Sequence, residues 1–320
     1  MSHVCLILPF YGKSWPAYFG LWVDSVRDRE LDVLLVTDMP VGELNLPSNI
    51  MVLNLPFTKI KTLAEEKLGT SVALNSVRKL CDLKPFYGKV FDDYLGKYAY
   101  WAFGDADLVY GRALDALIDR VVASGCDVWS NRQHWISGGL CFVRNTEIGR
   151  NLAMRANNWR EVLANSTCLL FDELGCNDFA KLERGEIAVA DCSARCDSFT
   201  GVVWRADDLL VVHENIICED SLDNAVVVME DGKLSLLQSG GFSMTIPIFH
   251  YINAKKHRAF TVSARYRVRS YRILASGIYP ASWGRMRSWS VEWLRKARGE
   301  LRYGRYRVFR FVKHRLGLGK

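Results

Sequence analysis

Apolar runs that end in turn-forming or polar residues recur along the first half of the chain. One covers residues 3–8 and stops at Pro9, a second covers residues 31–37, and a third covers residues 49–55. Continuous runs of this kind predict strands covered on both faces, as in a parallel sheet, because a half-exposed strand would alternate apolar and polar residues. A helix predicted over residues 16–29, between the first two runs, gives the strand–helix alternation of a doubly wound α/β protein.

Later segments continue this pattern as far as residue 254. No internal repeat or low-complexity linker divides them, so residues 1–254 are expected to form one domain. In chain order they predict a helix over 79–98 interrupted near Pro85, strands over 98–104, 125–131 and 137–145, a helix over 146–165, and a hairpin over 225–238 that turns at Asp231 and Gly232.

The composition fits a folded protein of a reducing compartment. The chain has 320 residues, 49% of them hydrophobic, which is enough for a substantial core. Its nine cysteines are odd in number and irregularly spaced, and the first residues do not form a signal peptide, so a cytoplasmic protein is expected. Cys192 and Cys196 stand close together, but no second Cys or His pair follows at zinc-ligand spacing, so both are expected to be unligated thiols. No apolar run reaches the roughly 18 residues needed to cross a bilayer.

The charge is distributed unevenly. Residues 255–320 hold 19 Lys and Arg and 2 acidic residues, a net charge of +17, whereas the whole chain carries +7 and residues 1–254 therefore carry −10. In this last fifth of the chain the basic residues alternate with Trp, Tyr and Phe. We therefore expect residues 255–320 to form a separate, basic, helical C-terminal extension.

Two acids follow the predicted strand that ends at Gly104. Asp105 and Asp107 are one residue apart, at the kind of strand end where ligands of open α/β sheets bind. Two close carboxylates repel each other unless a cation neutralises them, and oxygen ligands of this kind suit Mg²⁺ or Mn²⁺. A D-x-D triplet also occurs in ordinary solvated turns, so its context has to decide between the two interpretations.

That context resembles the nucleotide-sugar glycosyltransferases of the GT-A fold, in particular bacterial transferases associated with capsule and surface polysaccharides. The resemblance covers most of residues 3–256. It implies a Rossmann-like, mostly parallel sheet flanked by helices. The motifs that carry it are LPFYGKSWP, VTD, KLCDLKPFYG, FGDADLVYG, SGGLCFVRN, FDELGCNDF and IFHYINAKKH.

The resemblance also implies a metal site and a diphosphate site. The last motif is similar to the H-x-x-G-x-x-K signature of the glycogenin and lipopolysaccharide-galactosyltransferase type, with Asn253 in the place of its Gly. By this resemblance Asp107 and His250 bind Mn²⁺ or Mg²⁺, Asp105 binds the metal or the donor ribose, and Lys256 contacts the donor diphosphate. A metal and a lysine would stabilise the negative charge that grows on the departing nucleoside diphosphate.

Other polar and glycine residues at the predicted strand ends are expected to contact the donor. Asp38 would meet the nucleotide base or ribose, or else cap a turn. The residues after the first strand and in the S-G-G turn also have an ordinary structural explanation, as the end of a strand or a tight turn, whereas Asp82 and Lys84 are candidates because the resemblance implies donor-binding polar residues there. The remaining candidates for donor binding are Pro9, Tyr11, Gly12, Asp82, Lys84, Ser137, Gly138 and Gly139.

Asp172 and Glu173 are the candidates for the chemical step. One of them would act as general base on the acceptor hydroxyl in an inverting enzyme, or stabilise the oxocarbenium-like sugar in a retaining one. Adjacent acids are also common in the first turn of a helix, where they complement its dipole. The sequence leaves both explanations open.

Three partners suit the basic extension: an anionic membrane surface, a nucleic acid, or solvent alone. Aromatic and basic residues together favour the anionic inner face of the plasma membrane, where lipid-linked acceptors lie. The sequence thus predicts a cytoplasmic, peripheral membrane enzyme that moves a sugar from a nucleotide-diphosphate donor, most simply a UDP-sugar, to a lipid-linked or growing surface glycan, with no nucleic-acid partner. The rival hypothesis is a nucleic-acid-binding protein with a non-catalytic α/β domain, which would have no need of the acids, His250 and Lys256.

Overall fold

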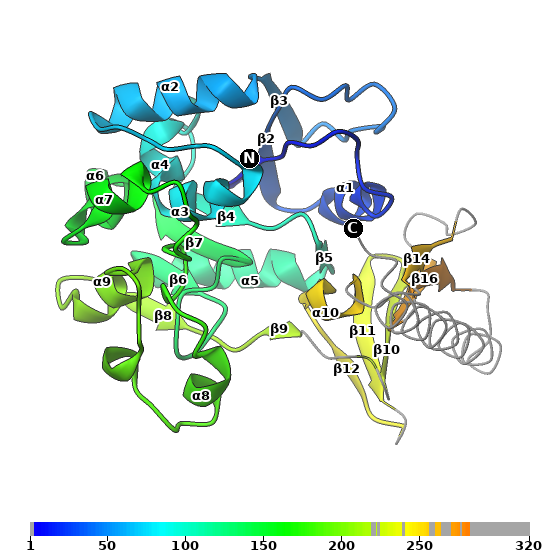
Figure 1. Cartoon of the computed structure of the whole chain (residues 1–320). Helices are drawn as coiled ribbons and strands as arrows, with labels where there is room; N and C mark the ends of the chain where they lie inside the picture. Colours follow the sequence, from blue (N-terminus) through cyan, green and yellow to red (C-terminus); the bar gives the residue numbers. More distant parts are fainter. Residues whose placement is uncertain are drawn as a thin grey trace, which may run out of the picture. The chain divides into compact units, whose positions relative to one another are not determined.

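A largely parallel sheet of seven strands forms the centre of the first unit of the chain, Met1–Ile217, in the computed structural model (Figure 1). The structure describes residues 3–218, 222, 225–238, 241–255, 260–263, 270–275 and 277–281. Across the sheet the order is β3-β2-β1-β4-β7-β6-β8, and β7 alone runs antiparallel to its neighbours. The strands are β1 (Val4–Pro9), β2 (Leu31–Thr37), β3 (Ile50–Asn54), β4 (Tyr100–Gly104), β6 (Val128–Ser130), β7 (Leu140–Arg144) and β8 (Val211–His213).

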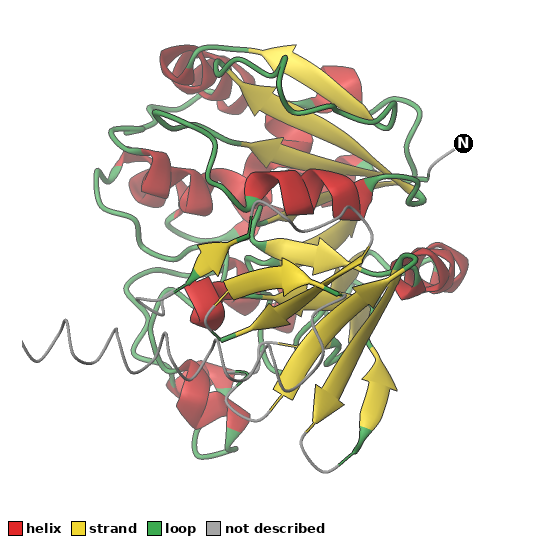
Figure 2. Cartoon of the chain, turned by 90° about the vertical axis from the view of Figure 1, so that its right-hand side faces the viewer, coloured by secondary structure: helices red, strands yellow, loops and turns green. Residues whose placement is uncertain are grey.

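Both faces of this sheet are buried, which explains why the central strands read as continuous apolar runs. Along β4, Trp101 and Phe103 join the large hydrophobic core on one face. Tyr100 points to the other face, where its hydroxyl donates to the carbonyl of Cys126 at 2.7 Å, just after α5 (Ala113–Ser124). Figure 2 shows helices in front of and behind these strands. The arrangement is the Rossmann-like one that the sequence predicts.

Helices of the first unit are mostly short. The two longest, α2 (Phe57–Leu68) and α5, each end at a glycine in the left-handed conformation, Gly69 with φ 62° and Gly125 with φ 61°. Glycine adopts this conformation without a Cβ penalty and so terminates a helix readily. The others are α1 (Phe19–Val26), α3 (Leu80–Leu83), α4 (Tyr87–Val90), α6 (Glu147–Asn151), α7 (Trp159–Ala164), α8 (Phe179–Glu183) and α9 (Phe199–Arg205).

The predicted strands of the first unit are all present, whereas the predicted helices are shorter than expected. The helix over 16–29 is reduced to α1, and the one over 146–165 is divided into α6, a 3₁₀ turn and α7. Around Pro85 the chain makes a succession of short α and 3₁₀ turns, because proline lacks the amide needed inside a continuous helix. Local periodicity therefore predicted the strands better than the lengths of the helices.

The second unit, Cys218–Lys320, contains a six-stranded sheet of order β12-β11-β10-β15-β16-β14. The predicted hairpin is its β10–β11 pair, and the turn residues Asp231 and Gly232 have φ values of 47° and 81°, as a tight hairpin turn requires. The strands are β10 (Ala225–Glu230), β11 (Lys233–Gln238), β12 (Ser243–Thr245), β14 (Thr261–Val262), β15 (Ser270–Leu274) and β16 (Gly277–Pro280), and the unit also holds β13 (Ile248–His250) and α10 (Ile252–Lys255).

The division between the units differs from the predicted boundary at residue 254. It lies at β9 (Ile217–Cys218), so the hairpin expected in the first domain belongs to the second unit. The predicted helical extension also needs correction where the structure describes it, because residues 261–262, 270–274 and 277–280 are strands. The pattern of apolar residues in the sequence did not distinguish these short strands from the rest of the basic segment. In the described part of the chain, no helix combines the length and the apolar character needed to span a membrane.

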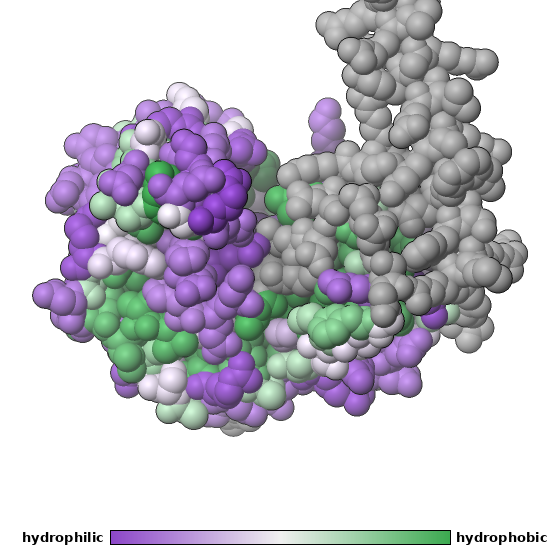
Figure 3. All heavy atoms as spheres, turned by 90° about the horizontal axis from the view of Figure 1, so that it is seen from below, coloured by the Kyte–Doolittle hydropathy of each residue, from purple (hydrophilic) through white to green (hydrophobic). Residues whose placement is uncertain are grey.

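Apolar side chains also reach the surface at scattered positions, among them Met51, Ile148, Trp204 and Leu210. Figure 3 shows apolar residues in patches among hydrophilic ones on the face seen from below. Single exposed apolar residues are normal for a folded protein. The polar groups at the edge of the sheet, rather than surface hydrophobicity, therefore point to a functional site.

Gly88 in α4 offers a test of the packing between helices and sheet. A Cβ added there would overlap the indole ring of Trp101, which is fully buried on β4. We expect Gly88→Ala to lower the free energy of unfolding by about 1–3 kcal/mol, because the ring has no space to move into. Urea denaturation measures the change. Gly42→Ala is the matched control, since a Cβ at Gly42 meets nothing within 4 Å, and equal stabilities of the two variants would contradict the packing described.

Candidate functional site

The residues singled out in the sequence gather where the parallel strands of the first unit end. Because β1, β2 and β4 run in the same direction, their carboxyl ends lie at one edge, and antiparallel β7 begins at that edge. The backbone amide of Asp105, after β4, donates to the carbonyl of Gly139, just before β7, at 3.0 Å. A Cβ on Gly104 would lie 2.8 Å from the same carbonyl oxygen, so β4 and the Gly139 loop approach closely only because Gly104 has no side chain.

Lys84 lies at the centre of this edge and is almost fully buried. Its ammonium group donates to Asp105 Oδ1 at 2.7 Å and to the carbonyl oxygen of Gly138 at 2.9 Å, and it lies 3.4 Å from Asp172 Oδ2. Lys84 reaches this position because the chain turns sharply at Pro85, in the 3₁₀ turn that joins α3 to α4. Four segments far apart in sequence are thus joined by one cation.

The charges of this group depend on one another. Burial disfavours the charged form of Lys84, but the carboxylates of Asp105 and Asp172 outweigh this effect and hold its pKa well above the ordinary value. Burial raises the pKa of Asp172, and Lys84 only partly opposes that rise. Asp105 differs from both, since its side chain is 34% exposed. The site therefore combines a fixed cation, an accessible carboxylate and a buried carboxyl group with a raised proton affinity.

Gly138 brings the backbone of the β7 loop against Asp172 and Glu173. Its amide donates to Glu173 Oε1 at 2.9 Å, and a Cβ at this position would overlap the Asp172 carboxylate. Ser137, also buried, accepts a hydrogen bond from the Gly139 amide at 3.1 Å. Asp172 Oδ1 is buried and has no hydrogen-bond partner among the described residues. Buried carboxyl oxygens without a hydrogen-bond partner are rare in folded proteins, and those that occur are often found at functional sites.

Asp82 is held by several hydrogen bonds in the interior of the first unit. It is fully buried, its carboxylate accepts from Lys79 Nζ at 2.7 Å, and it also accepts from the backbone amides of Leu169 and Phe171 at 2.8 and 2.9 Å. A carboxylate held in this way anchors the structure around it, and contact of Asp82 with a donor stays a prediction. Asp82 fixes the loop that leads into Asp172. Lys79 was not among the predicted residues, although its spacing of three residues from Asp82 on a helical segment was a usable signal.

Tyr11 and Asp38, which follow β1 and β2, both contact the segment that leads from β3 into α2. The Tyr11 hydroxyl donates to the carbonyl of Leu55 at 2.6 Å, and its ring packs against Phe57 with centroids 5.2 Å apart. Pro9 ends β1 and Gly12 is exposed. Exposed Asp38 accepts a hydrogen bond from the Phe57 amide at 3.3 Å, at the start of α2. Contact of these residues with a nucleotide stays a prediction.

The predicted metal ligands fall on two units. Asp107 is buried directly before β5 (Leu108–Tyr110), and His250 is buried at the end of β13. Asp105 and Asp107 lie in the first unit and His250 in the second, so a metal ion shared by all three stays a prediction of the sequence. Two carboxylates and an imidazole are a donor set that suits Mn²⁺ or Mg²⁺, so the residue types fit the expected cofactor. Lys256, expected at the diphosphate, lies outside the described residues.

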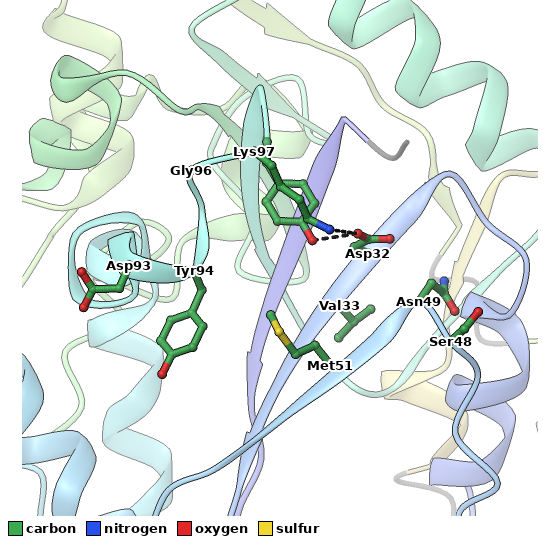
Figure 4. A pocket seen from close by; sticks show the side chains of 10 residues that line it. Asp32, Val33, Ser48, Asn49, Met51, Asp93, Tyr94, Gly96 and Lys97 are labelled. Atoms are coloured by element: carbon green, nitrogen blue, oxygen red, sulfur yellow. Dashed lines mark hydrogen bonds and ion pairs between the residues drawn. The ribbon is translucent and has the colours of Figure 1, made fainter.

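A pocket of about 430 Å³ lies at the amino ends of β2 and β4, and no predicted site residue lines it. There Asp32 accepts from the Tyr98 hydroxyl at 2.7 Å and from Lys97 Nζ at 3.3 Å (Figure 4). The side chains of Asp32, Lys97 and Tyr98 are therefore already paired with one another. The pocket is at the opposite end of the strands from Lys84, so it is separate from the candidate site.

Comparison with known proteins gives a family and a solved structure of low similarity. No curated protein matches the sequence. Among solved structures, the chain is similar to the crystal structure of the glycosyltransferase GlyE of Streptococcus pneumoniae TIGR4, with 11% identity and a TM-score of 0.29. The match covers 68% of this chain and 46% of that one, so the chain spans less than half the length of that neighbour. The model of a family of unknown function, DUF6625, matches residues 6–282. The chain therefore belongs to the DUF6625 family.

Proposed function

We propose that this protein is a metal-dependent glycosyltransferase of GT-A type that transfers a sugar from a nucleotide-diphosphate donor to a bacterial surface glycan. The single observation that carries the proposal is the buried Lys84 between Asp105 of the D-x-D triplet and Asp172. The group lies at the carboxyl edge of a largely parallel sheet, which is where α/β proteins of this kind bind nucleotides. The motif resemblance described above supports the same assignment.

The donor site is assigned to the loops after β1, β2 and β4. In this arrangement Pro9, Tyr11, Gly12 and Asp38 surround the nucleoside, and the acids after β4 hold the ion that neutralises the diphosphate. Asp105, Asp107 and His250 would hold Mn²⁺ or Mg²⁺, which supplies positive charge to the departing nucleoside diphosphate. Lys256 would add a second positive charge at the same group.

The sugar is assigned to the surface formed by Gly138, Asp172 and Glu173. Glycine at 138 lets the backbone approach a substrate closely, and the Gly138 amide is already oriented by Glu173 at 2.9 Å. Asp172, with its raised pKa and an unpartnered buried oxygen, is able to hold or release a proton at the reacting sugar. Lys84 keeps this carboxyl group in place while it also orients Asp105.

Removal of a metal ligand should abolish metal-dependent nucleotide binding and leave the fold intact. We expect Asp107→Ala and His250→Ala to lose measurable affinity for UDP in the presence of Mn²⁺, because both residues stand at strand ends and are the proposed metal ligands. Titration calorimetry with UDP and Mn²⁺ measures the effect, and thermal melting checks the fold. Asp119→Ala, an exposed acid on α5, is the control. Wild-type affinity in both ligand variants would refute the metal assignment.

The amide variants Asp172→Asn and Glu173→Gln test the chemical step. Glutamine at 173 can still accept from the Gly138 amide, so a loss of turnover there would report the charge and not the hydrogen bond. We expect at least one variant to lower donor-hydrolysis turnover by about 10²-fold or more with little change in UDP affinity. Near-normal turnover in both variants would show that Asp172 and Glu173 have structural roles only.

The pH dependence of turnover provides a further readout of the same variants. Burial raises the pKa of Asp172. If turnover needs the ionised form, it should therefore decline, as the pH is lowered, at a higher pH than it would with an ordinary carboxyl group. Asp172→Asn should therefore remove the acidic limb of the pH profile. An unchanged acidic limb would show that a group other than Asp172 causes the loss of turnover at low pH.

We further propose that residues 282–320 attach the enzyme to an anionic membrane. This segment holds 12 basic and 2 acidic residues, and each basic residue gains about 1 kcal/mol near such a surface. Full-length protein should sediment with anionic liposomes at low salt, be released at high salt, and ignore zwitterionic liposomes. Deletion after Ala281, which keeps β14, β15 and β16, should abolish sedimentation and spare donor hydrolysis. Tight RNA binding without liposome binding would favour the nucleic-acid hypothesis.

A further inference from the structure

A second group of metal-ligating side chains lies in the loop that follows Asp172 and Glu173. Residues 175–195 form a loop within the first unit, and the loop is closed by a hydrogen bond from the Arg195 amide to the Gly175 carbonyl at 2.9 Å. Within it, Cys176, Asp178 and Cys192 each offer one ligand atom, and these atoms lie within 4.8 Å of one another. We propose that these three residues bind a zinc ion that fixes the loop.

The distances suit zinc with little rearrangement. On a tetrahedral zinc ion with S and O ligands, neighbouring ligand atoms lie about 3.5–4 Å apart. The group therefore needs to contract only slightly around the ion. Two thiolates and a carboxylate select zinc over Mg²⁺ or Mn²⁺, because soft sulfur ligands bind those harder ions poorly. Three protein ligands leave the fourth position to water.

The neighbours of the group orient its ligands. Asp178 Oδ2 accepts from the Ser193 amide at 3.3 Å, and Asp178 Oδ1 lies 2.9 Å from Lys181 Nζ. Two thiolates, one carboxylate and Zn²⁺ carry a net charge of −1, which Lys181 offsets. Outer contacts of this kind are typical of metal sites, where they hold the ligands in position.

The loop also has a reason to need an ion. The loop contributes only two buried residues, Cys176 and Leu182, to its hydrophobic cluster, and the other two, Trp135 and Leu174, lie outside it. A segment with so small a core gains little from apolar burial, and small folded segments commonly depend on a metal or a disulfide instead. The sequence expectation of unligated thiols considered Cys192 with Cys196, but the chain folds so that Cys192 meets Cys176, 16 residues earlier. Cys196 faces the Leu169 carbonyl instead, at 3.9 Å.

This inference is independent of the proposed transferase activity. Its consequence for the site is mechanical, because the loop begins two residues after Glu173 and the chain beyond it is fastened to the same segment. The Phe199 amide donates to the Phe171 carbonyl at 2.8 Å, and the Thr200 amide donates to the Glu173 carbonyl at 3.2 Å. A zinc ion in the loop would thus stabilise both ends of the segment that carries Asp172.

Cobalt substitution in the full-length protein tests the proposal. Reduced protein stripped with a chelator is titrated with Co²⁺, and one equivalent should produce the near-ultraviolet sulfur-to-cobalt absorption band. One equivalent of Zn²⁺ should then remove the band. The group of Asp105, Asp107 and His250 contains no sulfur, so it cannot produce this signal, and the result stands whether or not the protein is a transferase. Absence of the band, or a Cys176–Cys192 disulfide that persists under reducing conditions, would overturn the proposal.

Variants identify the ligands. We expect Cys176→Ser and Cys192→Ser to lose the band, and Asp178→Asn to weaken Co²⁺ binding by at least about tenfold, since even outer contacts of metal sites are worth that much. Cys196→Ser is the matched control and should keep the band. Because Cys176 is buried and its variant can misfold, Cys192→Ser, at a partly exposed position, carries the test independently. Wild-type binding in Cys192→Ser, or loss of the band in Cys196→Ser, would refute this ligand set.

Discussion

The charge of Lys84 is the constraint on which the candidate site depends. A buried ammonium group is costly unless nearby carboxylates and hydrogen-bond acceptors compensate it. Here Asp105, Asp172 and the Gly138 carbonyl do so, and they come from three separate segments of the first unit. Loss of the lysine would leave two carboxyl groups close together without a cation. The same interaction therefore holds the edge of the sheet together and partly opposes the rise that burial causes in the pKa of Asp172.

Glycines make this arrangement of charges sterically feasible. Side chains at Gly104 and Gly138 would collide with the Gly139 carbonyl and with Asp172, respectively. The backbone of the β7 loop can thus approach both the end of β4 and the acidic pair, which places backbone amides and carbonyls beside carboxylates. A site built from backbone groups and short contacts is preorganised, and preorganised polar groups can stabilise a developing charge without having to reorient.

A second buried lysine supports the first. Lys79 Nζ lies 2.7 Å from Asp82 and 2.7 Å from the Val162 carbonyl, and Asp82 in turn receives the amides of Leu169 and Phe171. These bonds hold the segment before Asp172, whereas the proposed zinc ion would hold the segment after Glu173. The acidic pair is thus fixed from both sides. Anchoring on both sides explains how a region of short helical turns and loops can hold a carboxyl group in a fixed position.

The sequence by itself determined the strands of the first sheet, because burial on both faces requires continuous apolar runs such as residues 4–8 and 31–37. It also placed Asp105 and Lys84 among the candidates, Asp105 as an acid at a strand end and Lys84 through the resemblance of the motif around Pro85. Other properties depended on contacts between distant segments. Only the tertiary structure showed that Asp82 is an internal anchor, that residues 270–274 and 277–280 add strands to a second sheet, and that Cys192 meets Cys176 rather than Cys196. Local periodicity records which faces of an element are buried, but it does not record which distant residue buries them.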